Sequence, residues 1–443
     1  MSTHTRLLSL RRVPLGRRVW LRTYRATVLV RRSFLGGSVK RLCAISRACR
    51  WTQRLWPQAA RSLAANDGLL STRPPVVAAE PTGDCAQLWA LARRCAGLTA
   101  VDLSACRGLT QLSAPNGRIS ACPAVETLSL RGLLQLGDIS LLSVCFPSLT
   151  ALDVSSCRGL RLQLQNGPHP RALMCCQLLV HLSLSGLRNL DSLESLRAVD
   201  CEAEEDVSHN SGVENATSLL LRLRSLDAAC CRSLTSICAL ATGGGAPKLR
   251  SLTLRKCRAL LDLDGLQGCA GLTELSLNDC RQLSSSALSR LRSCGATLQS
   301  LSLATCQGLT EIEGLRCCAV LKRLDLGGCR SLRSVNALED LRCHLCFLNL
   351  KGCEKLCDLG PLQGAQALTT LNIAFCSSVA SLHAIRTCPA LTWLDASFTK
   401  NVRDVGVLAQ CARLVHVVLT GCMVDKDAIA RLRRACPLAS VIA

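Results

Sequence analysis

Cysteine is the residue of this 443-residue chain that offers the most chemistry, because it occurs thirty-one times. The tightest group is Cys343-His344-x-Cys346, which Cys353 and Cys357 follow. A C-x2-C pair with further thiols can hold zinc, and cysteines can also form disulfides or act as nucleophiles. Each of these chemistries requires particular thiols to converge, so the spacing of the cysteines decides among them.

Most cysteines belong to a repeated motif of the form L-x-x-L-x-L-x-x-C-x-x-L, whose positions we number 1 to 12. From Leu249 onward, successive copies start 23 to 26 residues apart, which is the period of a solenoid array. The thirteen copies begin at Leu98, Val125, Leu149, Leu179, Leu223, Leu249, Leu272, Leu298, Leu321, Leu345, Leu368, Leu391 and Leu414.

Two columns of cysteine result from this period. Position 9, where the chain must turn within a crowded interior, suits a small side chain with a weak S–H donor. It holds Cys106, Cys157, Cys231, Cys257, Cys280, Cys306, Cys329, Cys353, Cys376 and Cys422, with Leu133, Leu187 and Thr399 in the other copies. The second column, three residues before a start, holds Cys95, Cys122, Cys176, Cys269, Cys318, Cys388 and Cys411.

These columns predict that the thiols are packing residues. We therefore expect the protein to reside in a reducing compartment. Cys353 belongs to the first column and Cys346 occupies position 2 of its copy, so the sequence favours ordinary packing over a zinc site there. We expect no metal, no cofactor and no small-molecule substrate.

Alternation within each copy predicts a short strand with one solvent-facing side. Positions 4 and 6 share parity and are aliphatic, whereas position 5 between them is small and polar in twelve of thirteen copies. The outward residues are Asp102, Ser129, Asp153, Ser183, Asp227, Thr253, Ser276, Ser302, Asp325, Asn349, Asn372, Asp395 and Val418. The prediction is an α/β solenoid with one short parallel strand per repeat and short helices or turns on the convex side.

The motif resembles that of the cysteine-containing leucine-rich repeat proteins, which include F-box substrate receptors and many kinetoplastid repeat proteins. The resemblance covers roughly 98–437 and implies a curved horseshoe that binds other macromolecules. Most repeats here have 23 or 24 residues rather than the longer F-box-associated length, and no F-box-like helical module is recognisable before Leu98.

The amino-terminal segment 1–66 contains fourteen arginines and Lys40 but no acidic residue, and so carries fifteen of the net +22 charges. This composition, with interspersed Leu, Val, Ser and Thr, is typical of a mitochondrial transit peptide. A retained basic arm that binds RNA is the second interpretation, and arginine-rich coding bias is the third, since the chain has 45 Arg against 8 Lys.

The rest of the chain divides by composition. Residues 67–83 predict a linker, 84–97 a helical cap, 98–437 the solenoid and 438–443 its end, which begins a further repeat. An exposed acidic loop is expected near 197–217, where CEAEED interrupts the period. No apolar stretch approaches the ~18 residues of a membrane span, so none is predicted.

Two groups of side chains predict an interaction surface on the concave side. Aromatic residues at position 3 (Phe347 and Trp393) and position 8 (Phe375 and Phe398) lie close to Arg323, Lys351 and His416, a composition typical of binding hot spots. The alternative for Phe375 and Phe398 is that they turn inward. The second group, which we call the basic rim, follows position 9 and comprises Arg107, Arg158, Arg232, Arg258, Arg281 and Arg330, unless these are merely solvated turn residues.

The sequence does not indicate a catalytic site. The seven histidines are scattered, and Gly243-Gly244-Gly245 lacks the Lys-Ser/Thr of a phosphate loop. We therefore predict a non-enzymatic scaffold that binds a protein partner on its concave face, in a mitochondrial protein or ribonucleoprotein assembly. The alternatives are a cytoplasmic or nuclear adaptor of a ubiquitin ligase and a direct RNA-binding protein.

Overall fold

The computed structural model separates the chain into two units, Met1–Pro74 and Pro75–Ala443. It describes residues 76–78 and 99–442, apart from 105, 113–120, 138, 161–172, 174 and 198–218. The predicted basic segment 1–66, the helical cap 84–97 and nearly all of the acidic loop 197–217 lie outside the described residues.

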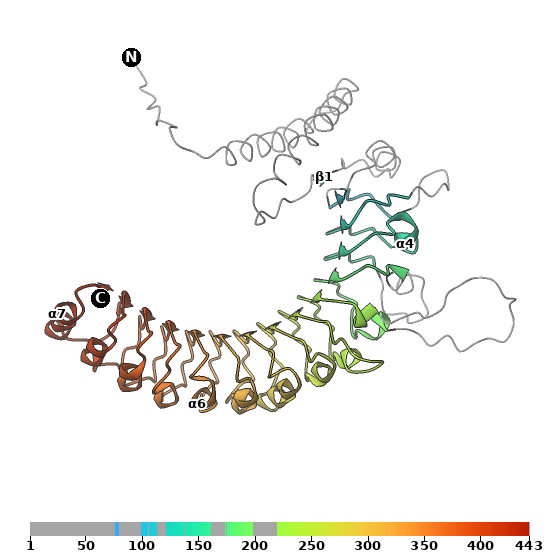
Figure 1. Ribbon diagram of the computed structural model, residues 1–443. Coiled ribbons are helices and arrows are strands. Elements are labelled where there is room, and N and C mark those ends of the chain that lie inside the picture. Colours follow the sequence, from blue (N-terminus) through green and yellow to red (C-terminus); the bar gives the residue numbers. More distant parts are fainter. Residues whose placement is uncertain are drawn as a thin grey trace, which may run out of the picture. The chain divides into compact units, whose positions relative to one another are not determined.

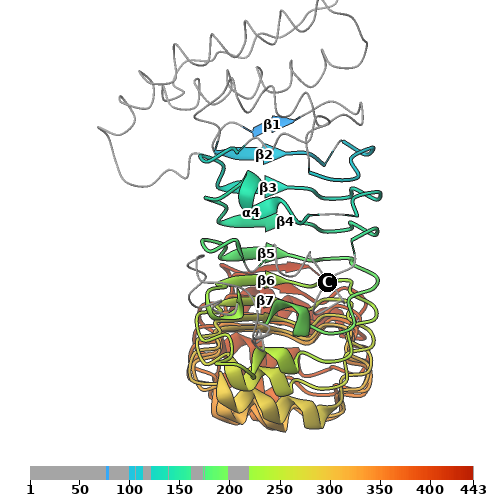
Figure 2. The same ribbon diagram turned by 90° about the vertical axis from the view of Figure 1, so that its right-hand side faces the viewer.

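A single parallel sheet of fifteen strands runs through the unit Pro75–Ala443, and its strands pair in sequence order (Figure 2). Each strand has three residues, at positions 3 to 5 of its repeat. The strands are β1 Val76–Ala78, β2 Ala100–Asp102, β3 Thr127–Ser129, β4 Ala151–Asp153, β5 His181–Ser183, β6 Ser225–Asp227, β7 Ser251–Thr253, β8 Glu274–Ser276, β9 Ser300–Ser302, β10 Arg323–Asp325, β11 Phe347–Asn349, β12 Thr370–Asn372, β13 Trp393–Asp395, β14 His416–Val418 and β15 Ser440–Ile442.

Two of these strands extend the array beyond the thirteen repeats. β1 lies inside the segment 67–83 predicted as a linker, where Val76–Ala78 pairs in register with β2. The rest of that predicted linker lies outside the described residues. At the other end, β15 pairs with β14, as the partial motif at 438–443 predicted.

Short helical turns form the convex side, opposite the strands (Figure 1). Three α-helices occur in the described part, α4 Leu142–Cys145, α6 Leu338–Leu341 and α7 Lys426–Ala435. The other turns are 3₁₀ helices: η1 Glu194–Leu196, η2 Leu219–Leu221, η3 Cys238–Leu240, η4 Asp264–Gly268, η5 Ser285–Ser293, η6 Glu313–Cys317, η7 Gly360–Leu362, η8 His383–Thr387 and η9 Val405–Gln410. None of the described helices is long and apolar enough to cross a membrane.

The core is one continuous cluster between the sheet and the convex turns. Positions 4 and 6 are buried throughout, as in Leu324 and Leu326 of β10 and its turn. A repeat on its own orders some 23 residues at about 1.5 kcal/mol each, which its few buried aliphatics do not offset. Stacking against neighbouring repeats therefore stabilises the array.

The position 9 cysteines form a hydrogen-bonded ladder that joins neighbouring repeats. Each Sγ–H donates to the carbonyl at position 6 of the preceding repeat, at 2.9–3.3 Å, in Cys157, Cys231, Cys257, Cys280, Cys306, Cys329, Cys353, Cys376 and Cys422. The same carbonyl accepts the backbone N–H of the position 9 residue in its own repeat, as Leu254 does from Cys257. The expectation that these cysteines are packing residues with weak donors is confirmed.

A sharp turn at position 8 follows each of the strands β3 to β14. From the second repeat onward this residue has a positive φ, a conformation that glycine adopts freely and other residues adopt at a cost. Glycine fills the position at 132, 186, 328, 352 and 421, whereas the other repeats have Ser156, Cys230, Lys256, Asp279, Thr305, Phe375 and Phe398.

Candidate interaction surface

Burial suppresses thiol chemistry in both cysteine columns. Desolvation raises the pKa of Cys306, Cys329 and Cys269 from 9.0 to about 12, so these thiols remain protonated at neutral pH. Every cysteine in the described part of the chain is free of a disulfide. Within the same residues, no group of His, Cys, Asp and Glu side chains could hold a metal ion, and the Cys343–Cys357 cluster provides none.

The outward residues at position 5 have a structural role that the sequence analysis did not recognise. Their side-chain oxygen accepts the backbone N–H two residues later, at 2.8–3.1 Å, in Asp102, Asp153, Asp227, Asp325, Asn349, Asn372 and Asp395. This bond holds the chain as it leaves the strand, which explains why short Asp and Asn recur there. The carboxylates are therefore committed to the turn rather than free for acid–base chemistry.

Position 3 provides a continuous row of side chains across strands β10 to β14. In register, the row is Arg323, Phe347, Thr370, Trp393 and His416. Adjacent strands in a sheet lie about 4.8 Å apart, so neighbours in the row are in contact range. The Arg323 guanidinium lies over the Phe347 ring, with Cζ 4.8 Å from its centroid, and this pairing orients both side chains.

Position 8 brings the second pair of predicted aromatic residues together. The rings of Phe375 and Phe398 are stacked, with centroids 4.7 Å apart and planes 15° apart. They remain 45% and 41% exposed, so they lie on the surface and do not turn inward to fill the core. We call these two residues the aromatic pair.

Two neighbours complete the stack around the aromatic pair. Lys351 places its Nζ 5.5 Å from the centroid of the Phe375 ring. Phe398 lies over Gly421, where an added Cβ would come within 2.6 Å of the ring atom Cδ1. A column therefore runs along the edge of the sheet from Lys351 through the two rings to Gly421.

The basic rim is less uniform than the sequence suggested. All six arginines are exposed, but Asp279 binds both Arg258 and Arg281, at 2.9 and 2.7 Å. Burial opposes ionisation of Asp279, yet the hydrogen bonds from the two arginines outweigh it and hold the pKa of this carboxyl below its usual value. Glu354 similarly contacts Arg330 at 3.3 Å, so local acids partly neutralise the rim.

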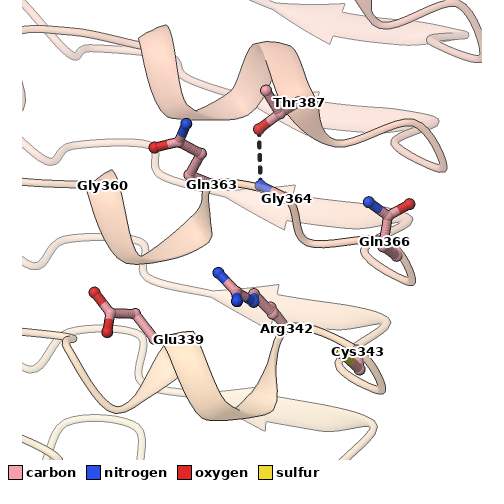
Figure 3. A pocket seen from close by; sticks show the side chains of 8 residues that line it. All are labelled: Glu339, Arg342, Cys343, Gly360, Gln363, Gly364, Gln366 and Thr387. Carbon is pink, nitrogen blue, oxygen red and sulfur yellow. Dashed lines mark hydrogen bonds between the residues drawn. The ribbon is translucent and has the colours of Figure 1, made fainter.

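An open hollow also lies on the convex side. It has a volume of about 570 Å³ and is lined by Glu339, Arg342, Cys343, Gly360, Gln363, Gly364, Gln366 and Thr387 (Figure 3). Within this lining, the backbone N–H of Gly364 donates to Thr387 Oγ1 at 2.8 Å.

The architecture is now defined by one strand per repeat, an aliphatic core and a ladder at position 9. This chain has the leucine-rich repeat fold. No protein-family model and no curated protein sequence matches it.

Solved structures with the leucine-rich repeat fold are similar to this chain. The internalin InlF from Listeria monocytogenes is 19% identical, with a TM-score of 0.49 over 84% of this chain and 92% of its own. Yeast Rad7, crystallised in complex with Elc1, is 16% identical, with a TM-score of 0.41 over 92% and 98%. TLR13, crystallised with ssRNA13, is 17% identical, with a TM-score of 0.46 over 79% and 58%. These likenesses concern the fold and carry no argument about what this leucine-rich repeat chain binds.

Proposed function

We propose that this protein is a non-enzymatic scaffold whose concave face, over strands β10 to β14, binds a protein partner. The position 3 row carries the proposal. It sets two aromatic side chains and two basic or titratable ones side by side on one rigid sheet, and all of them point away from the core. Aromatic residues and arginine dominate the binding energy of protein interfaces.

Trp393 is the centre of this proposed surface. It lies between Thr370 and His416 in register and is partly exposed, so a partner that covers it would bury a large apolar area. Truncation of such a residue in an interface costs about 2 kcal/mol or more, which corresponds to about 30-fold in affinity.

Quantitative affinity purification of the full chain, expressed at its native level, tests the proposal. The variants are Trp393→Ala and, as a matched control, Leu261→Ala, which removes an exposed leucine outside the concave face. We expect Trp393→Ala to lose a defined set of co-purifying proteins that wild type and Leu261→Ala retain. Identical sets for all three proteins would contradict the proposal.

We further propose that the scaffold acts in a mitochondrial protein or ribonucleoprotein assembly. The acid-free, arginine-rich composition of residues 1–66 supports import. Microscopy and terminal-peptide mass spectrometry of a carboxy-terminally tagged copy provide the test. An organellar signal with a terminus processed within residues 1–66 is expected, whereas an intact terminus with a cytosolic or nuclear signal would favour the adaptor or RNA-binding alternatives.

A further inference from the structure

The aromatic pair occupies backbone positions that disfavour it. Phe375 has φ 61° and Phe398 has φ 57°, in the region where a bulky residue is an outlier. Glycine fills the same position in the repeats on both sides, at Gly352 and Gly421. Strain of this kind concentrates at functional sites, so two bulky residues where glycine would fit point to a role other than stability.

The ring faces of the pair are already occupied within the protein. Phe375 is covered by Lys351 on one face and Phe398 on the other, and the far face of Phe398 lies on Gly421. The exposed parts of Phe375 and Phe398 therefore include the ring edges. Aromatic edges carry positive partial charge, so they favour carboxylates, and the apolar rings also pack against aliphatic groups. The contacts already made by the ring faces disfavour stacking of a nucleobase.

Two cations, Lys351 and Arg323, lie on the candidate surface. Within the described residues, neither Lys351 nor Arg323 forms an ion pair with a carboxylate. The oxygens of the nearby acids already accept other hydrogen bonds, Asp325 from Gly327 N–H and Asn349 Nδ2 and Asp395 from Ser397. The surface thus presents two cations without an ion-pair partner beside electropositive ring edges.

We infer that the aromatic pair and Lys351 form a receptor for an acidic, apolar segment of the partner protein. The inference rests on the proposed function and specifies the chemistry of its partner. A carboxylate of the segment contacts the Lys351 ammonium, and adjacent aliphatic side chains pack on the edges of Phe375 and Phe398. A single-stranded nucleic acid is the disfavoured alternative, because the ring faces on which its bases would stack already contact other residues of the protein.

Selection from a random twelve-residue peptide library, displayed on phage and panned on the immobilised full chain, tests the inference. The counter-screen uses the double variant Phe375→Gly/Phe398→Gly, in which glycine suits both backbone positions. This variant keeps the same net charge and the same arginine-rich segment 1–66, so peptides held only by charge are removed. Thr305→Gly, at position 8 of another repeat, is the control for the backbone change alone.

The expected result is enrichment of peptides that combine Asp or Glu with Leu, Ile or an aromatic residue. Their affinity should fall about tenfold or more in the double variant and in Lys351→Glu, and should remain unchanged in Thr305→Gly. Enriched peptides without acidic bias, or with equal affinity for the double variant, would overturn the inference. The same holds if single-stranded poly(U) RNA binds in a manner that depends on the aromatic pair.

Failure of the inference can be told apart from failure of the proposed function. If binding of the enriched peptides depends on Trp393 but not on the aromatic pair, the proposed concave binding surface stands. Only the inferred receptor for an acidic segment is then contradicted. If no enriched peptide depends on either Trp393 or the aromatic pair, both proposals fail.

Discussion

At the scale of single residues, position 8 is where this protein departs most clearly from what stability alone would favour. The turn needs a left-handed residue, and five repeats use glycine while seven do not. Thr305, Phe375 and Phe398 are the most unfavourable of these, because β-branched and bulky side chains tolerate positive φ poorly. Only the two phenylalanines are joined in a stack on the surface.

Phe398→Gly should therefore change the free energy of unfolding by only about 1 kcal/mol. Relief of left-handed strain, about 1–2 kcal/mol, opposes the loss of a stacked pair, about 0.5–1.5 kcal/mol. Urea titration monitored by circular dichroism measures the difference. The contrasting variant is Phe146→Ala, which removes a fully buried ring and should cost about 3–5 kcal/mol. Equal losses for the two variants would show that the exposed ring is a structural residue.

The reactivity of each thiol should decrease as its burial increases. Cys175, Cys238, Cys343 and Cys357 are exposed, whereas Cys306 is buried with its pKa raised to about 12 by desolvation. A short pulse of iodoacetamide at pH 7.5, followed by peptide mass spectrometry, should alkylate the four exposed thiols and spare Cys306. Denatured protein is the control in which all react. Labelling of Cys306 in native protein at the rate of Cys343 would refute the packing role.

At the scale of elements, the convex turns limit how closely neighbouring repeats approach. η4 follows η3 in the next repeat. An added Cβ at Gly265 would overlap the backbone of Ile237, which caps η3, and one at Gly268 would overlap the backbone of Leu240 in η3. Neither glycine has a positive φ, so the requirement is for space rather than for backbone conformation. Close packing of these turns sets the spacing of the repeats on the outer side.

Gly265→Ala should lower the free energy of unfolding by about 2–4 kcal/mol, because the Ile237 carbonyl is backbone and cannot move aside. Gly406, in the equivalent turn η9, has no atom within 4 Å of an added Cβ. Gly406→Ala is the matched control, and we expect it to be neutral or stabilising by up to about 1 kcal/mol. Urea midpoints of both variants test this, and equal midpoints would contradict the steric explanation.

At the scale of the whole molecule, the cysteine columns make the array sensitive to alkali. Desolvation raises the pKa from 9.0 to about 11 or 12 in Cys122, Cys157, Cys176, Cys231, Cys269, Cys280, Cys294, Cys306, Cys329, Cys376, Cys388 and Cys411. The unfolded chain then binds fewer protons than the native one between about pH 9 and pH 11. Stability is therefore complete below the unfolded pKa and is lost as pH rises towards the folded pKa.

Each such thiol costs about 0.4 kcal/mol at pH 9 and about 1.4 kcal/mol at pH 10, relative to neutral pH. Over all of these thiols the loss at pH 10 is on the order of 10 kcal/mol, comparable to the whole stability of an ordinary domain. Urea midpoints between pH 7 and pH 10, in the presence of a phosphine reductant, should fall steeply above pH 8.5. A midpoint that is constant up to pH 10 would contradict the buried, protonated state of the columns.

The sequence by itself determined the repeat, the strand positions, the buried columns and the helical turns on the convex side. These follow from local periodicity, since alternate burial of positions 4 and 6 and a fixed period leave one way to stack the copies. The aromatic and basic residues of the candidate surface were also recognisable by type and position. Because aromatic residues make up only 2% of the chain, Phe347 and Trp393 stood out at position 3.

Only the tertiary structure decided how those side chains are used. The motif does not reveal that position 8 is left-handed, that position 5 caps the turn, or that Phe375 stacks on Phe398 between Lys351 and Gly421. Each of these contacts depends on backbone dihedral angles or on a residue one repeat away. A leucine pattern constrains the inside of the solenoid, whereas the arrangement of its surface is set by which side chains the stacking brings next to one another.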